Sequence, residues 1–323
     1  MVAAAALIVV AAVVLPAAPG GYGAGRLACR LADERVTESS GVASASWSDD
    51  VIWTHNDSGD RPRFFAIETP TCTVRAVYDV AGARAVDWED MARSETTLYL
   101  GDVGDNDAER ESVTIYEVPE PVEGAPGGAV RASAARVLRY PDGAHDAESI
   151  FVDPASGRLA VVTKAAPAEA AVYLAPPEGN GEMERVAGVP VNWATGADAR
   201  SDRVIVRSYV NAYEWTVRPG AELDATFGSP PEAVGLPLTG QGEAIGYSRD
   251  GSGLWTTSER RGGPGEVHFV PADDPLSQDG SEEEQTGGAR WFRVGLPLGA
   301  AAVAGAVGAL AWRRAAVRSR TNG

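Results

Sequence analysis

Acidic and amide side chains cluster in four short strings of this 323-residue chain. Residues 101–110, GDVGDNDAER, hold three aspartates, one asparagine and one glutamate directly after the apolar run TLYL. The strings HNDSGD (55–60), DWED (87–90) and HDAE (145–148) have the same character. Such side chains bind hard cations such as calcium, transfer protons, or cap tight turns. Residues 101–110 do not form an EF-hand loop, which needs ligands at alternate positions and a glutamate at the twelfth.

Other catalytic chemistries have little support in the sequence. It contains no G-x-S-x-G nucleophile motif, no phosphate-binding glycine loop and no zinc-ligand spacing. The histidines are His55, His145 and His268, and His145 stands beside Asp146 and Glu148. We therefore keep His145 as a candidate catalytic residue, with a hydrogen-bonded surface histidine as the alternative.

The formal net charge of −17 argues against nucleic-acid binding, because an acidic surface repels a phosphate backbone. Lys164 is the only lysine in the sequence, and the other basic side chains, histidines aside, are arginines. With abundant alanine and glycine, this usage is typical of a GC-rich bacterial genome.

Both ends of the chain are predicted to lie outside the folded body. An apolar run ends in small residues near the N-terminus, which indicates a signal peptide, with an uncleaved anchor as the alternative. A second apolar run, flanked by aromatic residues and arginines, has the length of a transmembrane helix whose C-terminal side is cytoplasmic. The predicted parts are the signal peptide or N-terminal anchor (1–25), an extracellular body (26–275), an acidic flexible stalk (276–292), the cell-membrane span (293–312) and a basic cytoplasmic tail (313–323).

The body repeats one scheme of short β-rich runs, at a spacing of roughly 45–60 residues. Each repeat has an acidic residue among small neighbours, then a strand, a turn, a stronger strand, a polar loop and a third strand. Four-stranded units with this period are typical of propeller blades, so we predict an all-β five-bladed β-propeller. Six blades remain possible if one is degenerate, and a two-sheet sandwich is the other alternative. The repeats begin at Glu38, Asp87, Asp146, Thr195 and Gly242.

The last repeat has no fourth strand of its own in the sequence. Residues 26–37, RLACRLADERVT, precede the first repeat and are predicted to supply that strand and close the ring. This closure would bring Cys29 beside the first blade and Cys72. Two cysteines in an exported protein most simply form one disulfide, so we predict the pair Cys29–Cys72.

Propeller geometry predicts that the acidic strings share one face. The loop that enters each first strand and the loop that joins the second and third strands open at the same end of the central channel. The acids predicted to begin the first strands are Glu38, Glu89, Glu148, Asp198 and Glu243. The predicted second-strand ends add Asn56, Asp57, Asp102, Asp105, Lys164, Arg207 and Glu259. Asn106 and Asp107 are assigned to a turn, because Asx side chains cap their own backbone.

A ring of carboxylates around a narrow channel cannot stay ionised without partners. Backbone amides and hydroxyls could satisfy it, calcium could be bound, or the acids could serve as acid–base groups with raised pKa values. Glu148, His145 and Glu89 are the catalytic candidates in the last case. Lys164 and Arg207 either receive an anionic ligand or pair with acids of a neighbouring blade.

Several strings together resemble a known group of proteins. They are SGVA, WTHNDSG, DWEDMA, GDVGDN, IYEVPEP and GEAI, spread over residues 38–270. They resemble a family of exported, often membrane-tethered bacterial β-propeller proteins, similar in outline to the SdiA-regulated and phytase-like propellers of the TolB-like group. Phytase-like and lactonase-like propellers hold calcium in the channel. The resemblance therefore implies calcium on Glu38, Glu89, Asp102, Glu148 and Glu243, and it implies no particular catalytic residue.

Three functions follow as hypotheses. The first is a membrane-anchored extracellular binding module, with calcium in its channel, for a polar small molecule or an extracellular protein. The ligand-binding face would be Asn56, Asp57, Asp105, Lys164, Arg207 and Glu259. The second is a metal-dependent hydrolase of a phosphate ester, lactone or carboxylic ester that uses channel carboxylates. The third is a structural protein of the cell envelope.

Overall fold

A computed structural model describes residues 21–166, 168–259 and 264–273. The predicted stalk, membrane span and tail lie outside these ranges, as do residues 1–20 of the predicted signal peptide or N-terminal anchor. Within them, no helix is long and apolar enough to cross a membrane.

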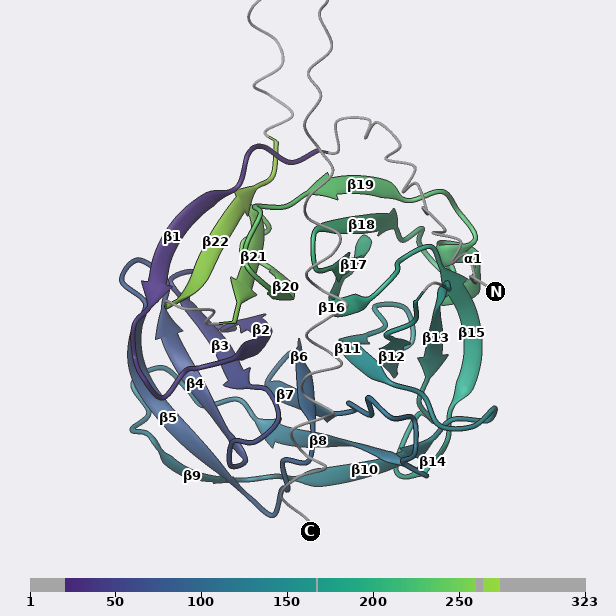
Figure 1. The fold of residues 1–323 in the computed structure, drawn as a ribbon, viewed down its shortest axis with the longest axis horizontal. Helices are drawn as coiled ribbons and strands as arrows, with labels where there is room; N and C mark the ends of the chain where they lie inside the picture. The colour runs from purple at the N-terminus through teal and green to yellow at the C-terminus, as the bar shows by residue number, and fades with distance from the viewer. Residues whose placement is uncertain (1–20, 167, 260–263, 274–323) are drawn as a thin grey trace, which may run out of the picture. The chain divides into compact units, whose positions relative to one another are not determined.

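Five sheets, each built on four antiparallel strands, form a ring around a central axis, so the all-β five-bladed propeller is confirmed (Figure 1). The innermost strands, in order around the ring, are β2 (Ser39–Ser44), β6 (Trp88–Ser94), β11 (Ala147–Val152), β16 (Ala194–Arg200) and β20 (Gly242–Tyr247). The second strands are β3 (Val51–Asn56), β7 (Thr97–Asp102), β12 (Leu159–Thr163), β17 (Arg203–Ser208) and β21 (Gly253–Ser258). The third strands are β4 (Arg63–Glu68), β8 (Val113–Pro119), β13 (Ala170–Leu174), β18 (Asn211–Thr216) and β22 (Gly265–Pro271). The fourth strands are β5 (Thr73–Ala81), β10 (Ala134–Arg139), β15 (Glu184–Val189), β19 (Glu232–Gly235) and β1 (Arg26–Leu31).

Apolar side chains between the blades hold the ring together. The second strands are rich in valine, isoleucine and leucine, which favour a pleated backbone, and β3, β12 and β21 are buried along their whole length. Trp53, Trp88 and Trp215 are fully buried in this packing. Trp193 differs: it is 48% exposed, in the turn before β16, with a backbone φ of 53°.

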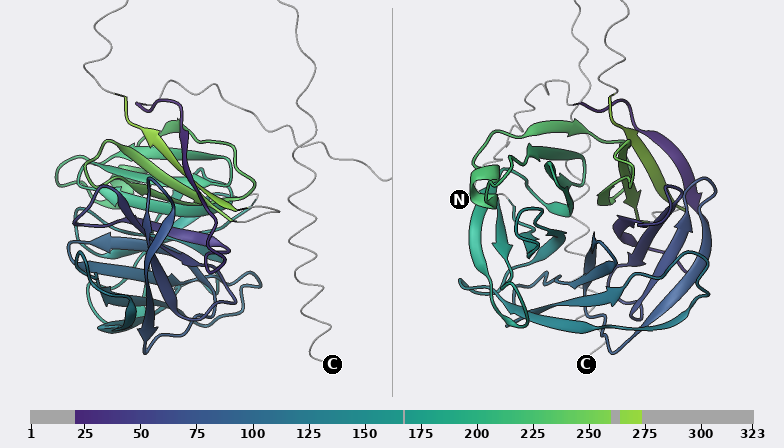
Figure 2. Two further views of the ribbon diagram at one scale, coloured as in Figure 1. Left: turned by 90° about the vertical axis from the view of Figure 1, so that its left-hand side faces the viewer. Right: turned by 180° about the vertical axis from the view of Figure 1, so that it is seen from behind.

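The N-terminal strand closes the ring. β1 pairs antiparallel with β22, so the fourth strand of blade five comes from the opposite end of the body sequence (Figure 2). The predicted disulfide Cys29–Cys72 is present, with the two Cα atoms 5.5 Å apart. It joins β1 in blade five to the turn before β5 in blade one, and so fastens the seam of the ring.

Three elements were not predicted. β9 (Gly128–Arg131) leaves the loop of blade two to pair, in parallel, with β5 of blade one. β14 (Gly181–Glu182) leaves blade three to pair in the same way with β10 of blade two. Both are short edge additions that join neighbouring blades on the outside of the ring. The third is one short helix, α1 (Leu223–Phe227), in blade four.

A bulge near the start of every innermost strand determines which side chains gather on the axis. In each blade the pairing register shifts there, and one or two residues have no partner opposite. We call this end of the ring the entry end and the end where the innermost strands finish the exit end. The bulge residues include Ser40, Glu89, Glu148, Thr195 and Glu243.

Removal of the disulfide tests the seam. The double variant Cys29→Ser/Cys72→Ser should lose about 2–4 kcal/mol of unfolding free energy, because a cross-link across 43 residues restricts the unfolded chain. Denaturant unfolding of the parent protein, with and without reductant, provides the control. If neither reduction nor substitution shifts the midpoint, the cross-link does not stabilise the ring.

Candidate functional site

Three bulge glutamates, Glu89, Glu148 and Glu243, form the centre of the candidate site at the entry end. Each is at least nine-tenths buried, although a carboxylate normally lies in water. The Glu148 carboxylate interacts electrostatically with both of the others, so blades two, three and five contribute to one cluster. Blades one and four place the smaller hydroxyls of Ser40 and Thr195 at the corresponding bulges.

Two aspartates complete one side of this cluster. One oxygen each from Asp57, Asp87 and Glu89 lie within 4.8 Å of one another. Asp57 follows β3, Asp87 precedes β6, and Glu89 is in β6, so the group bridges blades one and two. Gly104 lies against it: a Cβ there would come within 2.3 Å of Glu89 Oε1 and 2.6 Å of Asp87 Oδ2. The glycine in GDVGDN is therefore what lets the loop approach these carboxylates.

The opposite side of the cluster carries the lysine. Lys164 Nζ forms an ion pair and a hydrogen bond with Glu148 Oε1. It also lies 5.3 Å from the centre of the Tyr209 ring, within range of a cation–π contact. Both groups are largely buried, so this pair is much less screened than a surface salt bridge.

Arg207 lies beneath Glu243. Its guanidinium is 1% exposed and donates to the carbonyl oxygens of Ala244, at 2.8 Å, and Ser208, at 3.0 Å. Burial lowers the pKa of Arg207 to about 10, and the Glu243 carboxylate opposes that shift. The side chain is therefore charged at neutral pH and compensates part of the negative charge of the cluster.

Burial and mutual repulsion favour the protonated form of the cluster carboxyls by raising their pKa values. Burial, then the charges of Glu148, Asp57 and Asp87, raise the pKa of Glu89 well above its ordinary value. Burial, then Glu148, raise the pKa of Glu243 in the same way. Burial also raises the pKa of Glu148 to about 8, although Lys164 acts against this. Groups with such shifts are typical of functional sites.

Asp90 is a fully buried carboxylate next to this cluster. It accepts backbone hydrogen bonds from Ile150 at 2.9 Å and Ala197 at 3.1 Å, in blades three and four. It also accepts one from Met91 at 2.8 Å. Burial raises the pKa of Asp90 well above its ordinary value. These bonds tie three innermost strands together, so Asp90 is a structural link between blades.

Asp102 and Asp105 of GDVGDNDAER are engaged by their own loop. Asp102 accepts from the Asp87 amide at 3.1 Å and pairs with Arg110 at 3.0 Å. Asp105 accepts from the amides of Glu109 at 3.0 Å and Arg110 at 2.8 Å. Their carboxylates thus shape the loop that carries Gly104. Asn106 and Asp107 are exposed residues of the turn.

Asn56 and Glu38 lie at the entry end of blade one. The Asn56 amide oxygen accepts from the amides of Thr37 and Glu38, and its nitrogen donates to Asp60 Oδ2 at 2.6 Å. Glu38 forms an isolated backbone bridge with Glu259, the residue after β21 that is itself buried. Both Asn56 and Glu38 line a small hollow of blade one that includes Arg63.

Asp198 and His145 lie elsewhere than expected. Asp198 is the fifth residue of β16, three positions beyond the bulge, and lines a cavity at the exit end. Of the five predicted acids, Glu89, Glu148 and Glu243 interact with one another, and Glu259 also acts on Glu243. His145 Nε2 is 3.0 Å from Asp142 Oδ1 and 3.1 Å from the Tyr173 hydroxyl, on the outer part of its loop.

Three residues of this region were not among the predicted site residues: Asp87, Asp90 and Tyr209. The string DWED contained a signal for Asp87, because alternate residues of an extended chain share a face and Glu89 is two positions further on. Asp90 follows the bulge residue Glu89 and instead accepts hydrogen bonds from blades three and four. Tyr209 had no recognisable signal, since it lies in an irregular loop after β17.

Only one side of the cluster has the ligand atoms that suit a hard cation. Asp57, Asp87 and Glu89 all offer carboxylate oxygens, which calcium prefers, and Gly104 lets the loop backbone lie against two of them. The Glu148 side holds the Lys164 ammonium, which would repel a cation and attract an anionic or polar group. The cluster therefore has a cation-compatible half and a half suited to ligand binding.

No family model matches this chain, and none of the curated proteins does.

The raised pKa of Glu148 predicts a pH dependence of stability. The folded state holds this proton more tightly than the unfolded chain, so the stability it contributes is complete below about pH 4.5 and is lost as the pH rises toward about 8. Glu148→Gln should reduce the fall of unfolding free energy in that window, by at most about 1.4 kcal/mol per pH unit. Urea unfolding at a series of pH values measures it. Glu182→Gln, on the exposed strand β14, is the control, and an unchanged slope in Glu148→Gln would contradict the shift.

Proposed function

We propose that this protein is a ligand-binding propeller that holds calcium at the entry end on Asp57, Asp87 and Glu89. The observation that carries the proposal is the convergence of these three carboxylates within 4.8 Å. The charges of Asp57 and Asp87 act on Glu89 and raise its pKa, so the three carboxylates repel one another. A divalent cation would remove that repulsion, and carboxylate oxygens are its preferred ligands.

The other half of the cluster supplies the ligand contacts. Lys164, Tyr209 and Arg207 place two cations and a hydroxyl beside Glu148 and Glu243. Charge-assisted hydrogen bonds from such groups favour a polar ligand with acceptor oxygens, either a small molecule or an extracellular protein. Calcium would hold the acidic side in its ionised form and add a positive centre toward which such oxygens turn.

The location belongs to the same proposal. The arginine-flanked apolar run 293–312 anchors the chain in the cell membrane, with the propeller outside and the C-terminus in the cytoplasm. The Cys29–Cys72 disulfide supports this, because disulfides persist in oxidising compartments.

One observation favours a second candidate function, a metal-dependent hydrolase of a phosphate ester, lactone or carboxylic ester. The pKa of Glu148, raised to about 8 by burial, suits a general acid–base group at neutral pH, and Lys164 lies beside it. Glu148 would then exchange the proton while the cation side orients the substrate.

Calcium should stabilise the folded protein. At about a hundred times its Kd, calcium should raise the melting temperature by about 5 °C or more. Glu89→Gln should abolish most of this shift, because it removes a ligand charge. Gly104→Ala should reduce it, because the added methyl group collides with two of the carboxylates. Thermal unfolding with chelator, calcium or magnesium provides the measurement.

Two matched variants control this experiment. Glu232→Gln changes an exposed glutamate of β19, and Gly235→Ala adds a methyl group that meets no described atom within 4 Å. Both should keep the full calcium shift. A parent protein that melts at the same temperature in chelator and in calcium would overturn the cation site.

A hydrolase panel separates the two candidate functions. If the protein is an enzyme, Glu148→Gln should lower kcat by about 100-fold or more, as loss of a general acid–base group does. Glu182→Gln should leave the rate unchanged. No turnover of phosphate-ester, lactone or carboxylic-ester substrates by the calcium-loaded protein rejects the hydrolase, and turnover unaffected by Glu148→Gln rejects Glu148 as its acid–base group.

A further inference from the structure

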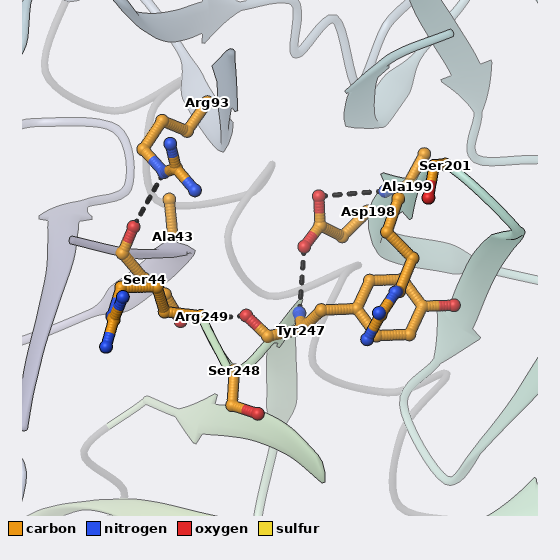
Figure 3. A pocket seen from close by; sticks show the side chains of 10 residues that line it. Ala43, Ser44, Arg93, Asp198, Ala199, Ser201, Tyr247, Ser248 and Arg249 are labelled. Carbon is orange, nitrogen blue, oxygen red and sulfur yellow. Dashed lines mark hydrogen bonds between the residues drawn. The ribbon is translucent and has the colours of Figure 1, made fainter. Parts of the chain in front are cut away.

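The exit end of the ring carries a second, oppositely charged cavity. It has a volume of about 180 Å³ and lies where the innermost strands of blades one, two, four and five finish (Figure 3). Three arginines line it, Arg93, Arg200 and Arg249, with Ser201 and Asp198. Arg93 is four residues beyond Glu89 along β6, or about 13 Å at the rise of a strand, so this cavity is separate from the entry-end cluster.

Backbone contacts hold Arg93 in place. Its Nε donates to the carbonyl oxygen of Ser44 at 2.8 Å, and its Nη1 donates to that of Glu95 at 3.0 Å. Figure 3 shows the guanidinium beside Ser44 at the edge of the cavity. Among the described residues no carboxylate forms an ion pair with Arg93, so its charge is balanced only at longer range.

The other two arginines have only exposed ion-pair partners. Arg249 Nη2 is 2.6 Å from Asp49, and Arg200 Nε is 2.9 Å from Asp202. All four side chains are 40% exposed or more, and such surface pairs contribute little, so the arginines can turn toward a ligand at small cost. The Arg200 guanidinium lies 5.8 Å from the centre of the Tyr247 ring, which orients it at the cavity wall.

The one carboxylate that lines the cavity, half-buried Asp198, already has hydrogen-bond partners. Asp198 accepts hydrogen bonds from the amides of Ala199 and Tyr247, each at 2.8 Å (Figure 3). Its oxygens are therefore committed to the backbone of blades four and five. The cavity thus presents three guanidinium groups and a serine hydroxyl around a carboxyl that holds the wall together.

We propose that this exit-end cavity binds a phosphate group through Arg93, Arg200 and Arg249. Guanidinium groups match the oxygens of a phosphate in bidentate geometry. The volume is smaller than the roughly 300–1,000 Å³ of sites for whole drug-sized ligands, so it suits one anionic group rather than a large molecule. A basic cavity is also exceptional in a chain of net charge −17, whose acidic side chains would otherwise repel such a ligand.

Titration with inorganic phosphate in chelator tests this proposal independently of the calcium site. The parent protein should bind phosphate saturably, as measured by calorimetry. Arg93→Gln and Arg249→Ala should each weaken binding about tenfold or more, the loss expected for a hydrogen bond to a charged group. Arg249→Ala removes a largely exposed side chain, so it remains informative if Arg93→Gln fails to fold. Arg75→Ala, on the exposed face of β5, is the control and should bind like the parent.

Two further variants test at which end of the ring phosphate binds and whether the charge of the cavity controls the affinity. Glu89→Gln, at the entry end, should leave phosphate affinity unchanged. Asp198→Asn should bind phosphate more tightly, because it removes the negative charge of the one carboxylate that lines the cavity. The proposal is overturned if phosphate does not bind, or if the folded variants Arg93→Gln and Arg249→Ala bind it like the parent. Loss of binding in Glu89→Gln, or weaker binding in folded Asp198→Asn, would overturn it as well.

Discussion

Buried carboxylates that cannot all be ionised at once dominate this molecule. An ion taken out of water costs several kcal/mol unless a partner compensates it, and the entry end places Glu89, Glu148 and Glu243 close together, with Asp57 and Asp87 beside Glu89. Protonation is one resolution, and burial and repulsion raise the pKa values of the glutamates accordingly. Binding of a cation is the other resolution. Lys164, the chain's only lysine, already provides one for Glu148.

The propeller converts a local irregularity into this convergence. A bulge near the start of an innermost strand turns one side chain out of the regular alternation, and the ring brings the bulges of neighbouring blades together. Loops of the same blades then close over the group, where Gly104 allows backbone to touch carboxylate. Asp90, next to this group of carboxylates, links the innermost strands of three blades. The same strands end about 13 Å away among arginines, so one set of strands gives the ring an acidic end and a basic end.

Sequence reasoning succeeded where the signal was periodic. The repeat spacing predicted five blades, the orphaned fourth strand predicted closure by residues 26–37, and closure predicted the Cys29–Cys72 disulfide. It did not place Asp198 correctly and did not single out Asp87, because a bulge shifts the facing of a strand by one residue and leaves no trace in composition. Nor could it foresee that loop amides would occupy Asp102 and Asp105, or that β9 and β14 would pair with the neighbouring blade.

The central claim is that the entry-end carboxyls exchange protons for a cation. Calorimetric titration with calcium near pH 7, repeated in buffers of different ionisation enthalpy, counts the protons released per calcium bound. Because burial and acidic neighbours raise the pKa of Glu89, calcium binding should release on the order of one proton. Calcium binding with no proton release, or no calcium binding at all, would contradict the account.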